Sequence, residues 1–199
     1  MSRTNLRRTS AAVGLLGAIL VAACGPIHEW PYVGDNPHCT ADFCVDVPGK
    51  GGASVKTSGD DACAFIDLID DSSFWYSVEW CRRKSLENAD ATAFYNYWDD
   101  FQSAYLGRNF GDARYQRISS AHVTLADGRP GIAFAGSGEH NGGKTGAIIV
   151  LATVVGGRSA TCYVLLDRQL PRNFDMLASN EYKNLLFVAS SVRSKTTGK

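Results

Sequence analysis

Three glycine-containing turns in the second half of the chain constrain its fold more than any other feature. They are Asp127-Gly128, Asn141-Gly142-Gly143 and Gly156-Gly157, and each separates runs rich in apolar and β-branched residues. Such turns need positive φ angles, which glycine and asparagine adopt easily, and they join neighbouring antiparallel strands. The sequence therefore predicts a meander of four strands, at about 115–125, 131–135, 147–155 and 159–166.

Two helices flank this meander in the sequence. Asn88 or Asp90 is expected to cap a helix that ends near Gly107, and Asn180 is expected to cap a last helix. Each helix has an apolar stripe at helical spacing, which predicts that it packs on the sheet. The stripe residues are Ala93, Phe94, Tyr97, Trp98, Phe101, Ala104 and Tyr105 in the first helix, and Tyr182, Leu185, Leu186, Val188, Ala189 and Val192 in the second.

The region before the first helix is also predicted to contribute strands. Alternating apolar residues indicate strands at 43–47 and 74–80, whereas 60–70 has the spacing of a short helix or turn. The second strand is predicted to be half-buried: Tyr76, Val78 and Trp80 share the face that should form part of the core, and Ser77 and Glu79 lie on the other face. The predicted fold class is α+β, an antiparallel meander with two main helices packed on it.

The N-terminus has the layout of an export signal. Arg3, Arg7 and Arg8 precede an apolar run at 11–23 that is shorter than the roughly 20 residues needed to span a bilayer. The end of the run, Leu20-Val21-Ala22-Ala23-Cys24, resembles the lipobox of bacterial lipoproteins. That resemblance implies that a diacylglyceryl group carrying fatty acids such as palmitate is attached to Cys24, after which the chain is cleaved before it.

We therefore expect residues 1–23 to be a signal peptide, 24–36 a tether, and 37–199 a single domain held on the outside of a bacterial membrane. The lipid chains alone would supply the attachment. The alternative is an ordinary secretory signal that is cut elsewhere and leaves Cys24 as a plain thiol.

Export changes the interpretation of the cysteines, because disulfides persist outside the cytosol. Five cysteines would mature there: Cys39, Cys44, Cys63, Cys81 and Cys162. Two local pairs, Cys39 with Cys44 and Cys63 with Cys81, are the predicted disulfides, and Cys162 is predicted to be a buried thiol in an apolar strand. A metal site made of His38, Cys39 and Cys44 is the alternative, but it lacks the paired spacing of structural zinc sites.

Charge and motifs argue against nucleic acid and nucleotide as partners. All 20 acidic residues follow the signal and three of the 20 basic residues lie within it, so the mature chain carries a net charge of −3. The segment from Gly138 to Thr145 satisfies G-x-x-x-x-G-K-[ST], yet the run after it is β-branched and predicts a strand. Phosphate binding needs a helix at that point. We interpret the segment as a hairpin turn and predict no cofactor.

No catalytic motif is evident. His122 and His140 lie in or near the meander, but no G-x-S-x-G elbow accompanies them, and no spacing of His38, His122 and His140 predicts zinc. The histidines are therefore expected at the surface or at strand edges.

The order of predicted elements and the serine-containing last helix, which ends Phe187-Val188-Ala189-Ser190-Ser191-Val192-Arg193, resemble the PsbP-like fold of small actinobacterial LpqN-type lipoproteins. The resemblance covers about 43–193. It implies a non-enzymatic binding or accessory module of the cell envelope whose partner is an envelope protein or a small ligand. The alternative is a small extracytoplasmic hydrolase with a site built from loops.

Overall fold

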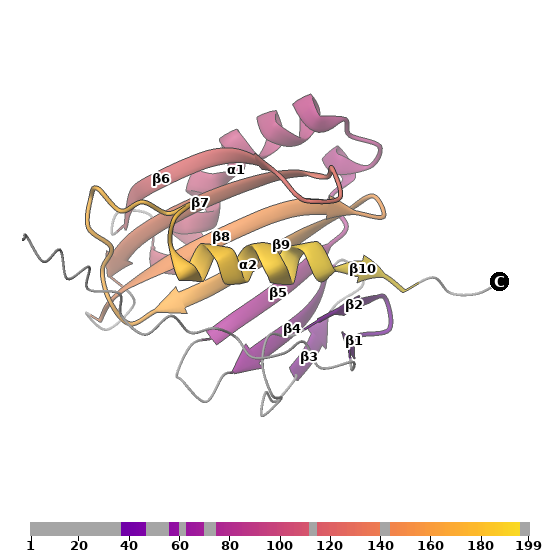
Figure 1. Ribbon diagram of the computed structural model, residues 1–199, viewed down its shortest axis with the longest axis horizontal. Helices are drawn as coiled ribbons and strands as arrows, with labels where there is room; N and C mark the ends of the chain where they lie inside the picture. The colour runs from indigo at the N-terminus through magenta and orange to yellow at the C-terminus, as the bar shows by residue number, and fades with distance from the viewer. Residues whose placement is uncertain are drawn as a thin grey trace, which may run out of the picture.

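The computed structural model describes residues 37–46, 56–59, 63–69, 75–111, 115–139 and 144–195. Within these ranges the chain forms ten strands, two α-helices and one short 3-10 helix, all shown in Figure 1. In chain order they are β1 (His38–Cys39), β2 (Phe43–Val45), β3 (Lys56–Gly59), β4 (Cys63–Ile69), β5 (Trp75–Cys81), η1 (Lys84–Leu86), α1 (Ala91–Phe110), β6 (Tyr115–Thr124), β7 (Pro130–Glu139), β8 (Thr145–Val155), β9 (Arg158–Leu166), α2 (Asn180–Ser191) and β10 (Arg193–Ser194).

Seven strands form one antiparallel sheet in the order β3-β4-β5-β9-β8-β7-β6. The predicted meander is therefore confirmed as β6 to β9. Gly128 has a φ of 83°, and Gly156 and Gly157 have φ of 57° and 73°, as tight hairpin turns require. The third predicted turn, Asn141-Gly142-Gly143, lies outside the described residues, but Glu139 pairs with Thr145 on either side of it.

The middle of the sheet is buried on both faces. Side chains of β8 alternate between two cores, with Ile148 and Val150 on the α1 side and Ile149 and Leu151 on the α2 side. Helix α1 contacts β6 and β7 on one face, while α2 contacts β8 and β9 on the other (Figure 1). The predicted α+β class, with two helices packed on antiparallel sheet, is thus confirmed.

Helix α1 begins where one of the two predicted caps places it. The carboxylate of Asp90 accepts a hydrogen bond of 2.8 Å from the backbone N–H of Ala93. The helix continues past Gly107, its expected end, to Phe110, and Gly111 ends it with a φ of 81°. Close packing on β7 depends on Gly136, since a Cβ there would lie 2.8 Å from Leu106 Cδ2.

Both ends of helix α2 are stabilised by hydrogen bonds from residues other than the predicted cap, Asn180. Ser179, not Asn180, is the N-cap, and its hydroxyl accepts from the N–H of Tyr182 at 3.1 Å. At the other end Arg129, from the β6–β7 turn, donates to the carbonyl oxygens of Ala189 and Ser190 at 3.2 and 3.1 Å. The last carbonyls of a helix lack the partner that each earlier carbonyl has one turn further on, and that of Ala189 accepts from the N–H of the C-cap residue Val192 at 3.4 Å. A cation that also reaches these carbonyls stabilises the helix end.

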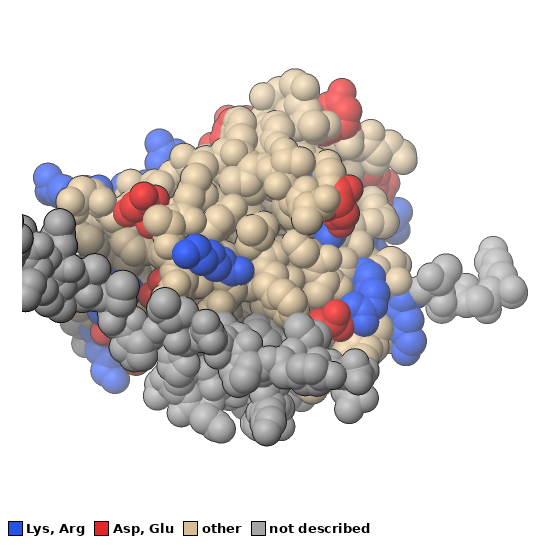
Figure 2. Space-filling model, viewed as in Figure 1, with Lys and Arg blue, Asp and Glu red and all other residues tan. Residues whose placement is uncertain are grey.

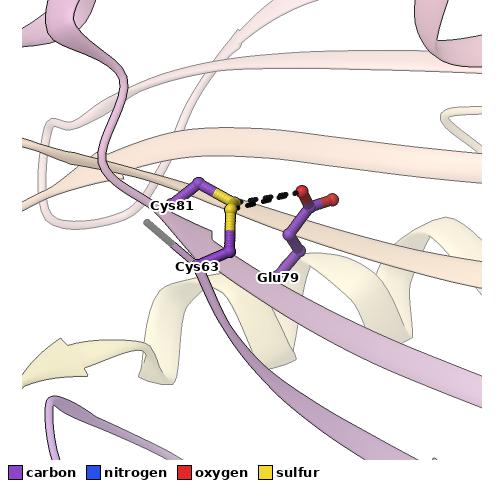
Figure 3. A group of neighbouring side chains, drawn as sticks. All are labelled: Cys63, Glu79 and Cys81. Atoms are coloured by element: carbon purple, nitrogen blue, oxygen red, sulfur yellow. Dashed lines mark hydrogen bonds between the residues drawn. A yellow bond between two sulfur atoms is a disulfide. The ribbon is translucent and has the colours of Figure 1, made fainter. Parts of the chain in front are cut away.

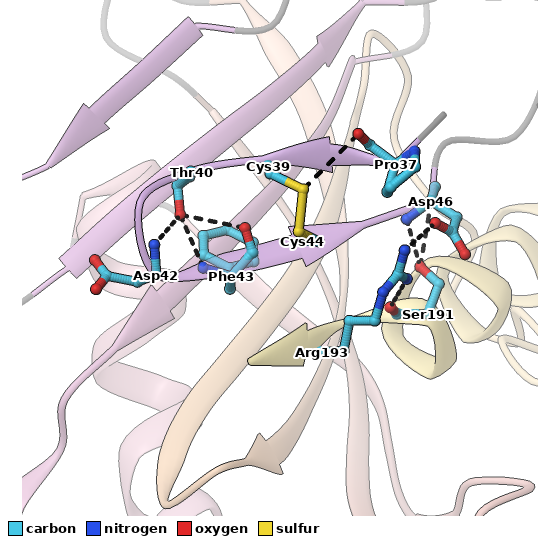
Figure 4. The surroundings of a disulfide bond; sticks show 9 residues. All are labelled: Pro37, Cys39, Thr40, Asp42, Phe43, Cys44, Asp46, Ser191 and Arg193. Carbon is cyan, nitrogen blue, oxygen red and sulfur yellow. Dashed lines mark hydrogen bonds and ion pairs between the residues drawn. A yellow bond between two sulfur atoms is a disulfide. The ribbon is translucent and has the colours of Figure 1, made fainter. Parts of the chain in front are cut away.

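A second sheet, in the order β1-β2-β10, lies beside the C-terminal end of α2 (Figure 1). Its middle strand places Phe43 and Val45 in the core on the α2 side. Ser191 and Arg193 bind the backbone and the carboxylate of Asp46, which joins the first described segment to the last (Figure 4). The pairing of β10 with β2 was not predicted, because the two strands are far apart in the sequence.

The interpretation of 60–70 as a short helix or turn is wrong for its described part. Residues 63–69 form strand β4, paired with β3 and β5 on either side. Its apolar residues fall on both faces, which imitates helical spacing. Strand β5 also differs from the prediction, because its second face is buried as well: Ser77 and Glu79 are 1% and 3% exposed.

Candidate functional site

A cavity of about 520 Å³ lies at the end of the meander, within the size range of small-molecule sites. Tyr115 begins β6, Glu139 ends β7 and Thr145 begins β8, so three neighbouring strand ends meet there. The lining residues are Tyr115, Gln116, Ser137, Gly138, Glu139, Thr145, Gln169 and Leu170.

The segment after β9 forms the rest of the cavity wall. The backbone N–H of Leu170 donates to the hydroxyl of Ser137 at 2.8 Å, which ties this segment to β7. On the opposite side, the Tyr115 hydroxyl donates to the carbonyl oxygen of Ser103 in α1 at 3.0 Å. Two of the lining residues, Ser137 and Tyr115, are therefore tied by hydrogen bonds to the segment after β9 and to α1.

Among its described residues the lining is mostly polar and includes no cation. Gln116 and Gln169 offer amides, Ser137 and Thr145 offer hydroxyls, and Glu139 offers a carboxylate. Such a set can donate and accept hydrogen bonds with a small polar molecule, while the carboxylate disfavours an anion. The sequence does not reveal this cavity, because its polar lining residues belong to no motif and are brought together only when the strands fold.

A second cluster surrounds Glu79, on the face of β5 toward α1. Its buried carboxylate binds Arg83 and Arg108, each at 3.3 Å, and the Tyr105 hydroxyl donates to it at 3.5 Å. Arg83 lies over the ring of Phe101, and Arg108 lies over the ring of Tyr105. The cluster pins α1 to the sheet, since the carboxylate comes from β5 and two of its three partners from the helix.

Burial dominates the acid–base state of Tyr105 in this cluster. The pKa of Tyr105 is raised well above its ordinary value, mainly because its hydroxyl is buried away from water and secondly because Glu79 carries a negative charge nearby. Tyr105 therefore remains neutral and keeps its proton available for Glu79 at physiological pH. One carboxylate bound by two guanidinium groups and a neutral tyrosine makes this a buried structural centre.

The structure contains both predicted disulfides. Cross-strand pairing places Cys39 opposite Cys44 and Cys63 opposite Cys81. The first bond lies in the small sheet next to the Asp46 contacts (Figure 4). Cys162 is the remaining cysteine among the described residues, fully buried, and burial raises the pKa of its thiol to about 12. Its thiol is therefore protonated and unreactive, as a small apolar residue would be.

The described histidines do not line the cavity. His122 Nε2 lies 3.0 Å from a carboxylate oxygen of Asp99, its ring stacks on Tyr95, and its side chain is 48% exposed. His38 lies in β1, and His140 is outside the described residues. His122 is thus on edge strand β6, as the sequence predicts.

The segment that matches a phosphate-binding motif forms part of a hairpin. Thr145 starts the strand β8, which pairs with β7 on one side and β9 on the other. Strand β8, not a helix, follows Lys144, whose side chain is exposed, so the helix N-terminus that such a loop needs to hold phosphates is not formed by the described residues there. The hairpin interpretation is confirmed for the described residues on both sides of the turn.

Charged side chains do not form a basic stripe on the face drawn in Figure 2, where the described Lys, Arg, Asp and Glu residues are scattered. Neither described helix is long and apolar enough to cross a membrane. Cys24, the signal 1–23 and the tether 24–36 lie outside the described residues.

No protein-family model matches the sequence, and no curated protein matches it. Three solved structures are similar in fold at low identity. The Ran-binding protein Mog1p of Saccharomyces cerevisiae has a TM-score of 0.45 and 12% identity, over 81% of this chain and 95% of its own.

The second similar structure is a Pseudomonas aeruginosa protein of unknown function, with a TM-score of 0.39 and 7% identity over 66% of this chain and 81% of its own. The third, from Bacteroides thetaiotaomicron, has a TM-score of 0.41 and 10% identity over 79% of this chain and 46% of its own. At these scores the similarities carry no argument about function.

Replacing Lys144 with alanine tests the hairpin against a phosphate-binding loop. Because the side chain is exposed, we expect Lys144→Ala to change the free energy of unfolding by no more than about 0.5 kcal/mol. We also expect Mg-ATP and Mg-GTP to leave the melting temperature of both proteins unchanged. A nucleotide-dependent rise in the wild type that disappears in Lys144→Ala would contradict the hairpin interpretation.

Proposed function

We propose that this protein is an exported lipoprotein, attached through lipid on Cys24 to the outer face of a bacterial membrane, and that its domain is a non-enzymatic binding module. The observation that carries the binding role is the polar cavity at the end of the meander. The lipobox-like sequence before Cys24 supports the attachment. Two disulfides are in keeping with an oxidising compartment outside the cytosol.

Binding, rather than turnover, is favoured by the groups that line the cavity. Gln116, Gln169, Ser137 and Thr145 form hydrogen bonds well, but no histidine or lysine stands among the described residues that line the cavity to activate one of them as a nucleophile. His122, the histidine with an orienting carboxylate, is not among those residues. The ligand that this lining suits is a small polar molecule without net negative charge.

The element order adds support for an accessory role in the cell envelope. From α1 onward the chain has the order on which the resemblance to LpqN-type lipoproteins rests, a long helix, a meander and a closing helix, although five described strands rather than two precede the long helix. We propose membership of that group on this ground, with an envelope protein or a small ligand as the partner.

Native mass spectrometry of the protein purified from its own membranes tests the binding role. We expect a bound small molecule in the wild type and its loss in Thr145→Trp, because the indole at this exposed rim position would enter the cavity. The matched control is Thr124→Trp, because Thr124 is exposed and lies at the end of β6 opposite to Tyr115, which lines the cavity. This variant should keep the ligand. A ligand retained by Thr145→Trp, or absent from the wild type, would contradict the cavity as the binding site. A ligand that the protein converts into a product of different mass would favour the hydrolase alternative.

Replacing Cys24 with serine tests the attachment separately. Without the sulfur no diacylglyceryl group can be transferred, so Cys24→Ser should lose incorporation of labelled fatty acid and leave the membrane fraction or accumulate as precursor. Each acyl methylene contributes about 0.8 kcal/mol to membrane binding, so the loss should be nearly complete. Equal labelling of the variant and the wild type would refute the attachment.

A further inference from the structure

Three atoms suited to binding a metal ion lie together next to the Glu79 cluster. The sulfurs of Cys63 and Cys81 and a carboxylate oxygen of Glu79 all lie within 4.8 Å of one another (Figure 3). Cys63 faces Cys81 across the β4–β5 pair, and Glu79 precedes Cys81 by two residues, which places both on the same face of β5. The backbone of two paired strands therefore fixes all three groups.

The disulfide keeps both sulfurs occupied in the oxidised protein. Cys81 Sγ lies 3.0 Å from Glu79 Oε1. It can donate a proton to this oxygen only when the Cys63–Cys81 disulfide is reduced to two thiols. Reduction would thus leave two thiols directly beside a carboxylate. Thiolate and carboxylate are ligands that Zn²⁺ accepts in proteins, with Zn–S distances of about 2.3 Å.

The neighbouring charges suit the metal-bound form. One Zn²⁺ with two thiolates and one carboxylate carries a net charge of −1, and Arg83 and Arg108 lie 3.3 Å from the Glu79 oxygens. Their guanidinium groups would compensate that charge and orient the carboxylate, as partners behind metal ligands commonly do. Cys63 is only partly buried, whereas Cys81 and Glu79 are 1% and 3% exposed, so an ion or a reductant would approach from the Cys63 side.

We propose that Cys63, Glu79 and Cys81 form a Zn²⁺ site that exists only while the Cys63–Cys81 disulfide is reduced, with water as the fourth ligand. A dithiol reductant supplies two electrons, breaks the S–S bond and becomes a disulfide itself. The two cysteine thiols then lose their protons to solvent as the metal binds. Disulfide and metal exclude each other at this position, so the site reports the redox state of its surroundings.

The second disulfide is an internal control. The Cys39–Cys44 pair has the same cross-strand arrangement, but among the described residues it is not part of a group of three such ligands. A protein lacking this pair, Cys39→Ser/Cys44→Ser, isolates the proposed site. Two further variants on that background remove the carboxylate, Glu79→Gln, or both sulfurs, Cys63→Ser/Cys81→Ser.

Titration with Co²⁺, displaced afterwards by Zn²⁺, tests the proposal on the whole protein reduced by a phosphine. We expect one equivalent of Co²⁺ to bind the Cys39→Ser/Cys44→Ser protein with an intense sulfur-to-cobalt charge-transfer band, and reoxidation to abolish it. Removing both sulfurs should abolish the band, and Glu79→Gln should weaken binding by at least about ten-fold. Circular dichroism confirms that each reduced variant remains folded.

Several outcomes would overturn the site. One is a reduced background protein that stays folded and shows no charge-transfer band, and another is a protein that unfolds on reduction. Binding that is as tight in Glu79→Gln as in the background would remove the carboxylate from the site. A band that requires Cys39 and Cys44 would place the metal at the other pair.

Discussion

The structure depends on covering both faces of strand β8. Its residues from Gly146 to Thr153 are buried without interruption, and they alternate between two apolar cores. A strand of this kind is stable only when an apolar layer packs on each side. Helix α1 supplies one layer and α2, with β2 at its end, supplies the other. The capping of α1 by Asp90 and of α2 by Ser179 and Arg129 stabilises the two elements on which that burial depends.

The two polar clusters lie away from the middle of β8, which these two cores fill, although single hydroxyls such as those of Thr153 and Thr161 are buried on the central strands. The cavity lies where β6, β7 and β8 end, and Glu79 lies on β5, toward the opposite edge from the free side of β6. The two disulfides likewise join strands outside the meander. A scaffold with a rigid apolar centre and polar rims suits the binding role that we propose, since rim residues can vary without loss of core packing.

The sequence was sufficient wherever a local pattern determined the structure. Asp127-Gly128 and Gly156-Gly157 specify hairpins through the backbone angles of their glycines, and the apolar stripe of α1 includes the buried Phe94, Trp98 and Tyr105, although its Ala93 and Ala104 are exposed. The prediction failed at β4, where Phe65 and Ile66 point to opposite faces and so imitate a helix. Glu79 was predicted on the solvent-facing side of β5, because no local pattern links it to the arginines that cover it, Arg83 just before η1 and Arg108 in α1. The cavity was missed for a similar reason, since the approach of Leu170 to Ser137 joins segments that no local pattern connects.

Truncating adjacent residues of β8 tests the two-sided burial most directly. Ile148 and Ile149 are both fully buried, the first against α1 and the second against the α2 core. Urea unfolding should show that Ile148→Ala and Ile149→Ala each lower the free energy of unfolding by about 2–5 kcal/mol, because each leaves a cavity in a packed core. Thr124→Ala, exposed on β6, is the control and should cost no more than about 0.5 kcal/mol. A cost below about 1 kcal/mol for either isoleucine would show that its face of the sheet is not packed, and would contradict the account.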